Sequence, residues 1–147
     1  MAGDSDKVLG FDYGLARIGV AVGDVHTRIV QPLTTLACRK GSPEWRRIEA
    51  LLQTWLPCRV VVGKPGDTSP PELLHALNRF VSGLRRRFNG PVETADEAWT
   101  SNDAYRLLKQ RRSAGGARIR KEEIDKTAAA LILEGWLSRI EAADGAI

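Results

Sequence analysis

The feature that most constrains the fold is a pair of alternating segments, Lys7–Tyr13 and Ile18–Gly23, separated by a turn at Gly14. Successive side chains of a strand point to opposite faces of a sheet, so alternation with a period of two predicts strands. The residues that share one face are Val8, Gly10 and Asp12 in the first segment and Gly19, Ala21 and Gly23 in the second. The two segments therefore predict a β-hairpin with small residues along one face.

The rest of the chain predicts one further strand and then strands that alternate with helices. The third strand lies within Arg28–Leu36, where Pro32 restricts it to an edge or splits it. A first helix is capped by Ser42 and stopped by Pro57. Further helices are expected at about 71–88, 101–112 and 121–140, and strands at 59–63 and 91–95. This order predicts an α/β fold with a mixed sheet, in which a three-strand hairpin meander precedes alternating strands and helices that cover both faces.

The composition predicts a single domain spanning residues 1–147, with an ordered core at about 7–140. Hydrophobic residues make up 43% of the chain, which is enough for a core, and the net charge of +4 permits a polyanionic partner. Cys38 and Cys58 form no close pair, which argues against a disulfide scaffold or a structural zinc site. A polar N-terminus and no apolar run of roughly 20 residues predict a cytoplasmic protein without a membrane partner, as a monomer or weak homodimer.

Common catalytic motifs are absent from the sequence. It has no GxSxG, GxxxxGKS/T or GxGxxG segment, and His26 and His75 stand alone. Asp12, Gly14 and Gly19 resemble the first phosphate loop of sugar kinases and actin-like phosphotransferases. Those proteins enclose a nucleotide between two such domains, whereas 147 residues supply one. Carboxylates are therefore the main candidates for the chemistry.

Three acidic positions need an explanation. Asp12 lies within an apolar strand, where a buried carboxylate needs a partner or a metal, unless the strand ends there and Asp12 begins the turn. Asp96-Glu97 follows a short strand and Asp125 lies one turn into the last helix, although both could simply complement a helix dipole. Together, the three positions offer oxygen ligands of the kind that a two-cation site for phosphodiester hydrolysis requires.

At these positions the sequence resembles the YqgF-type family of Holliday-junction resolvases, also described as pre-16S rRNA nucleases, which have a ribonuclease H-like fold. The resemblance extends from Lys7 to about Trp136. It rests on Phe11-Asp12-Tyr13-Gly14, Ile18 to Gly23, Val61-Val62-Gly63-Lys64-Pro65, Asp96-Glu97 with Thr100-Ser101, and Asp125 with Ala128, Ala129, Ile132, Leu133 and Glu134.

The resemblance implies a nuclease that uses a divalent metal, Mg²⁺ or Mn²⁺, with Asp12, Glu97 and Asp125 as the catalytic metal ligands. The expected substrate is structured nucleic acid, and the leading hypothesis is 5′ processing of pre-16S rRNA in ribosome biogenesis. Resolution of Holliday junctions in branched DNA is the alternative. The family usually has an arginine where this chain has Ala98, so a non-catalytic nucleic-acid-binding module is a further alternative.

Basic residues supply the predicted substrate contacts. The clusters at Arg85–Arg87 and Lys109–Arg112 end predicted helices, where cations complement the helix dipole. The segment 113–121 is predicted to be a glycine-containing basic loop that leads to Asp125 and contacts phosphates. Trp99 either stacks on an unpaired base or packs as a wedge. The residues assigned to substrate binding are Arg118, Arg120, Lys121, Lys64 and Trp99.

Overall fold

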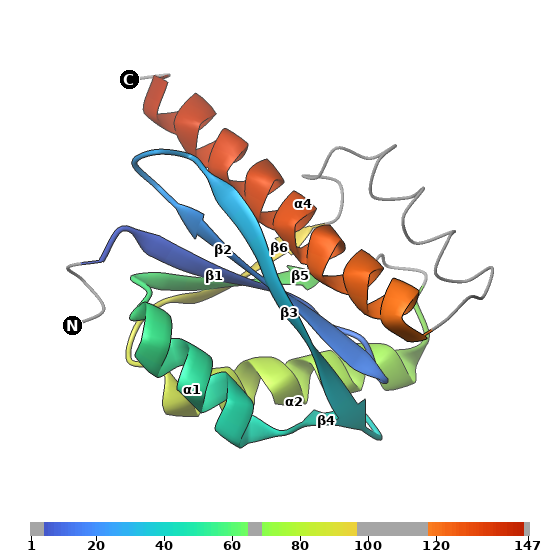
Figure 1. The fold of residues 1–147 in the computed structure, drawn as a ribbon. Coiled ribbons are helices and arrows are strands. Elements are labelled where there is room, and N and C mark those ends of the chain that lie inside the picture. The colour runs from blue at the N-terminus through green and yellow to red at the C-terminus, as the bar shows by residue number, and fades with distance from the viewer. Residues whose placement is uncertain (1–4, 65–68, 97–117, 146–147) are drawn as a thin grey trace.

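The computed structural model describes residues 5–64, 69–96 and 118–145. Its elements are β1 (Lys7–Asp12), β2 (Arg17–Asp24), β3 (Val30–Arg39), β4 (Ser42–Pro43), α1 (Trp45–Trp55), β5 (Arg59–Lys64), α2 (Pro71–Arg87), β6 (Val92–Asp96) and α4 (Arg118–Gly145) (Figure 1). Six strands form one sheet in the order β4-β3-β2-β1-β5-β6. The pairs from β1 to β4 along the chain are antiparallel, whereas β5 lies parallel to both β1 and β6. The predicted mixed sheet is confirmed.

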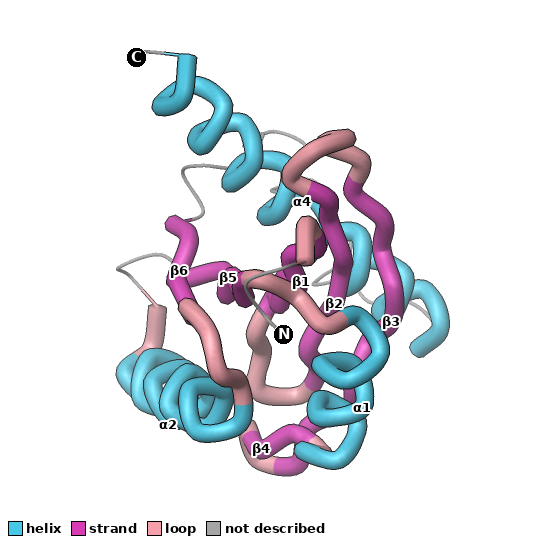
Figure 2. The backbone as a smooth tube through the Cα atoms, turned by 90° about the vertical axis from the view of Figure 1, so that its left-hand side faces the viewer, coloured by secondary structure: helices cyan, strands magenta, loops and turns pink. Residues whose placement is uncertain are grey.

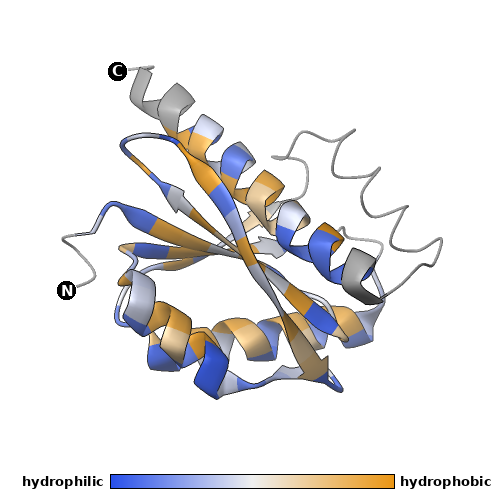
Figure 3. Cartoon of the chain, in the orientation of Figure 1, coloured by the Kyte–Doolittle hydropathy of each residue, from blue (hydrophilic) through white to orange (hydrophobic). Residues whose placement is uncertain are grey.

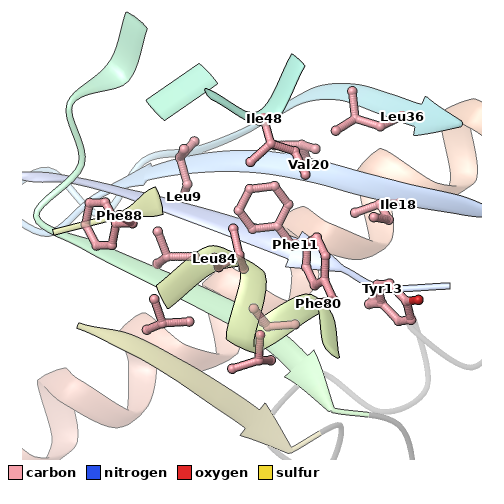
Figure 4. Packing of buried hydrophobic residues seen from close by; sticks show 14 of the residues in the cluster. Leu9, Phe11, Tyr13, Ile18, Val20, Leu36, Ile48, Phe80, Leu84 and Phe88 are labelled. Carbon is pink, nitrogen blue, oxygen red and sulfur yellow. The ribbon is translucent and has the colours of Figure 1, made fainter. Parts of the chain in front are cut away.

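Helices cover both faces of this sheet, as predicted (Figure 2). The helices α1 and α2 lie on one face, and their apolar residues pack on Leu9, Phe11 and Val20 of the sheet (Figure 4). The hydrophobic side of α2 faces the strands (Figure 3). On the opposite face α4 packs against Val8, Ala21 and other small or β-branched residues. The period-two alternation of the first two strands therefore divides the core into two layers.

The segment around Ser42 was predicted to begin a helix, and that prediction is wrong. Ser42 belongs to β4 and pairs with Arg39, because Lys40 and Gly41 form a tight turn with φ of 53° and 80°. The helix α1 begins only at Trp45, after Glu44 as its N-cap residue.

Pro32 does not split the third strand, and at Pro32 this strand pairs with β2 alone, as the predicted edge position requires, because β4 pairs only with Cys38 and Arg39. The pairing of β2 with β3 shifts register between Val20 and Ala21, and this irregularity accommodates the proline within a strand that continues to Arg39. Cys38 and Cys58 carry free thiols, as expected.

The last helix is longer than predicted at both ends. It begins at Arg118, so residues 118–121 are helical and do not form part of a basic loop. The predicted helix at 101–112 lies outside the described residues. Within the described chain, no helix is both long and apolar enough to cross a membrane.

Candidate active site

Asp12 is the last residue of β1 and belongs to the face that α4 covers. Its exposed fraction is 5%. Its neighbour across the antiparallel pair is Gly19 of β2, and its neighbour across the parallel pair is Gly63 of β5. Both flanking positions therefore lack a side chain.

The glycines on this face determine where α4 lies. A Cβ atom at Gly19 would overlap the backbone carbonyl of Asp125, and one at Gly63 would overlap the Cδ1 atom of Ile132. A Cβ at Gly10 would likewise overlap Leu133. The helix therefore rests directly on the strand backbone, and the backbone of Asp125 contacts the residue that pairs with Asp12. The glycine-lined face brings Asp12 and the backbone of Asp125 to the same end of the sheet.

Asp125 is 1% exposed and forms an ion pair with Arg17, the first residue of β2. The Nε atom of Arg17 donates to the Oδ2 atom of Asp125 at 2.8 Å. The side chain of Arg17 is 24% exposed, so the pair lies at the edge of the buried region. Such a charge-assisted bond fixes the orientation of the carboxylate and compensates for its burial.

Arg17 is a site residue that the sequence analysis missed. The alternation of Gly19, Ala21 and Gly23 can be extended back by one step of two residues, which places Arg17 on the same face. A cation on the same face as Asp12 was therefore detectable. It was overlooked because the second strand was read from Ile18.

Two backbone contacts hold α4 in this position. The hydroxyl of Thr35 on β3 donates to the carbonyl oxygen of Glu122 at 2.5 Å, and Glu122 lies about one helical turn before Asp125. Further along, the Nη1 atom of Arg28 donates to the carbonyl oxygen of Leu137 at 2.9 Å. The helix is thus bonded to the β2–β3 hairpin near Asp125 and three turns later.

The remaining predicted site residues are only partly covered by the structure. Lys64 is exposed at the end of β5, where it pairs in register with Asp96. Lys121 is half-buried on α4. The positions of Arg118 and Arg120 lie in the first turn of α4, but their side chains are outside the described part, as are Glu97 and Trp99 altogether.

The two described carboxylates suit a hard divalent cation. Asp12 and Asp125 are the only buried charged side chains among those that the structure describes. Their oxygen atoms are the donor type that Mg²⁺ and Mn²⁺ prefer. Within the same residues, no group of three potential ligands occurs. The structure therefore describes two of the three predicted metal ligands, Asp12 and Asp125. The third, Glu97, lies outside the described residues.

This architecture is that of a ribonuclease H-like α/β domain, and two solved structures share it. RuvC of T. thermophilus in complex with a Holliday junction substrate has a TM-score of 0.57 and 16% identity, covering 91% of this chain and 96% of its own. A second structure, of Thermus thermophilus RuvC, has a TM-score of 0.54 and 15% identity, covering 92% and 96%. At these identities the likeness concerns the fold.

Sequence similarity then defines the family. The model of RuvX, described as Holliday junction resolvase, matches residues 6–139, and the chain belongs to this family. A Pseudomonas aeruginosa (strain LESB58) relative named "Putative pre-16S rRNA nuclease" is 44% identical over 142 residues, covering 91% of this chain and 96% of the relative. An Azotobacter vinelandii relative with the same name is 42% identical over 135 residues, covering 89% and 92%. The resemblance to the YqgF-type family is confirmed.

Proposed function

We propose that this protein is a metal-dependent endonuclease that hydrolyses phosphodiester bonds, and that its reaction is 5′ processing of pre-16S rRNA. The observation that carries the proposal is the convergence of Asp12 and Asp125, both buried, where α4 rests on the backbone of Gly19. Burial of two carboxylates is costly unless cations compensate. The names of the relatives support the rRNA substrate.

In this proposal Asp12, Asp125 and Glu97 hold Mg²⁺ or Mn²⁺. A bound divalent cation supplies Lewis acidity to the attacking water and to the leaving oxygen. Arg17 holds the Asp125 carboxylate in one orientation through the 2.8 Å bond. The glycines beside Asp12 let α4 lie directly on the strand backbone, which brings the backbone of Asp125 against the residue that pairs with Asp12. Lys64, Arg118, Arg120, Lys121 and Trp99 are proposed to contact the substrate.

Cleavage of Holliday junctions is a second candidate function, and the description of the family favours it. Both reactions use the same chemistry and the same carboxylates, so the two candidates differ in the substrate rather than in the site. The cytoplasmic location and the state of monomer or weak homodimer belong to the same proposal.

Cleavage by the purified protein tests the proposal. A 16S rRNA fragment with its 5′ extension and a four-way DNA junction are incubated side by side with Mg²⁺, with Mn²⁺ or with EDTA. We expect metal-dependent cleavage of the RNA and none by Asp12→Asn purified in the same way, which controls for a contaminating nuclease. Cleavage of the junction alone would favour the second candidate. Metal-independent binding without cleavage of either substrate would favour a non-catalytic module.

A further inference from the structure

A cationic hollow of about 180 Å³ lies between the β3–β4 turn and α2, in the layer opposite to α4. Lys40, Arg79 and Arg86 contribute its charge, and Gly41, Trp45 and Phe80 are among its other walls. No acidic residue lines it in the part of the chain that the structure describes. A water molecule occupies about 30 Å³ in the liquid, so the hollow has room for a hydrated phosphate group.

The three cations of this hollow have no acidic partner among the residues that the structure describes. Within the described residues, Lys40, Arg79 and Arg86 form neither an ion pair nor a side-chain hydrogen bond. The neighbours of Arg86 differ in this respect, since Arg85 donates to the carbonyl of Val92 and Arg87 pairs with Glu49. The Arg85–Arg87 cluster thus contains two residues with internal bonds and one that faces the hollow.

The conformation of Lys40 is a second, independent observation. Its φ is 53°, in the left-handed region that disfavours side chains other than those of asparagine, aspartate and glycine. Asparagine would suit this first position of the two-residue turn better than lysine does. A lysine in a backbone conformation that disfavours it points to a role for this residue, which is one of those that line the hollow.

The hollow is connected to the end of β1 that carries Asp12. Tyr13, the next residue, donates its hydroxyl to the carbonyl oxygen of Gly41 at 2.5 Å. The ring of Tyr13 also stacks on Phe80, with centroids 4.9 Å apart (Figure 4). Gly41 and Phe80 both line the hollow. A nucleic acid whose cleaved bond lies at Asp12 therefore has this hollow close to the same end of the sheet.

We propose that Lys40, Arg79 and Arg86 bind a backbone phosphate of the nucleic-acid substrate, away from the bond that is cleaved. Arginine guanidinium groups match the geometry of phosphate oxygens, and such contacts give affinity that falls with salt and is independent of base sequence. The proposal rests on the proposed function, because it assumes that the substrate is a nucleic acid. It adds a positioning site on the α1–α2 layer.

Binding in EDTA tests this site without cleavage. The probe is the labelled 5′-extended 16S rRNA fragment, and its dissociation constant is measured between 50 and 300 mM KCl, roughly the range in which phosphate contacts dominate. Arg79→Gln/Arg86→Gln should weaken binding several-fold at the lowest salt and lower the slope of log affinity against log salt by about 1.5, because two counterion-releasing contacts are lost. Arg46→Gln/Arg47→Gln removes the same charge from α1 and should leave the slope within error.

Lys40→Asn separates binding from stability. Asparagine suits the turn, so the variant should be at least as stable as the wild type and yet bind the RNA more weakly. An unchanged salt slope in the Arg79/Arg86 variant would overturn the proposed phosphate site and leave the nuclease proposal intact. An equal loss of RNA affinity in the Arg46/Arg47 control would do the same. A wild type that binds neither this RNA nor the four-way junction would overturn the nucleic-acid proposal itself.

Discussion

Arg17 and Asp125 are 108 positions apart in the chain, and a 2.8 Å bond from the guanidinium to the carboxylate joins them. The bond connects the start of β2, which pairs with β1 at Asp12, to α4, which covers the same face of the sheet. Asp125 is almost fully buried and Arg17 is partly exposed. The guanidinium of Arg17 can therefore remain in contact with water while it compensates the charge of the Asp125 carboxylate, which is buried away from water.

The first prediction concerns this ion pair. Arg17→Met leaves the buried carboxylate of Asp125 without this partner and should lower the free energy of unfolding by about 2 kcal/mol. Asp125→Asn in the same background should recover much of the loss, because it removes the charge that Arg17 otherwise compensates. Urea unfolding of the wild type, both single variants and the double variant gives the coupling energy. A coupling energy near zero would mean that the bond contributes nothing to the fold.

The second prediction compares two glycines beside Asp12. Gly19→Ala meets the backbone of Asp125, which cannot move without shifting α4, whereas Gly63→Ala meets only the end of the Ile132 side chain. Gly19→Ala should therefore be destabilised by about 3 kcal/mol or more, and Gly63→Ala by less. Ile132→Val should rescue Gly63→Ala but not Gly19→Ala. Unfolding curves of the four variants decide this, and rescue of both would show that α4 adjusts freely.

The sheet and the glycine-lined face were predictable because alternation with a period of two is a local property of the chain. The position of Asp12 on that face, and the presence of helices on both sides, followed from the same pattern. The strand at Ser42 was not predictable. Serine before proline also suits a helix start, and only the pairing with Arg39 shows that Ser42 belongs to a strand. The contact of Arg17 with Asp125 depends on where α4 crosses the sheet, which a local pattern does not contain.

The third prediction uses the turn after β2. Asp24 accepts hydrogen bonds from the backbone N–H groups of Thr27 and His26 and from the Lys7 ammonium. These bonds, the one from Thr27 first, lower the pKa of Asp24 from 3.8 to about 2. A carboxyl whose pKa is lowered by folding adds stability above its unfolded pKa, and the contribution is lost as the pH falls from about 4 through 2.

Asp24→Asn should therefore flatten the fall in stability between pH 4 and 2. Chemical unfolding at a series of pH values measures the effect, and an NMR titration of the Asp24 carboxyl in the wild type measures its pKa directly. The variant should still form the turn, because asparagine keeps an acceptor oxygen for the two backbone N–H groups. A titration midpoint near 3.8 would contradict the prediction.

The last prediction concerns the metal proposed for the site. Asp12 and Asp125 are both buried on the α4 side of the sheet, and Arg17 is bonded to Asp125. A divalent cation that binds the folded protein should stabilise it by mass action, about 2.7 kcal/mol when free metal exceeds its dissociation constant roughly a hundredfold. For a domain of this size, that gain is several degrees in Tm.

Asp12→Asn should abolish most of the shift in Tm that Mg²⁺ or Mn²⁺ causes, because it removes one of the proposed metal ligands. Asp24→Asn, which also removes one carboxylate but lies at the opposite end of β2, is the matched control and should retain the full shift. Melting curves of the three proteins at neutral pH, with EDTA and with saturating metal, provide the measurement. Equal shifts in all three would place the cation elsewhere, and a wild type without any shift would favour the non-catalytic module.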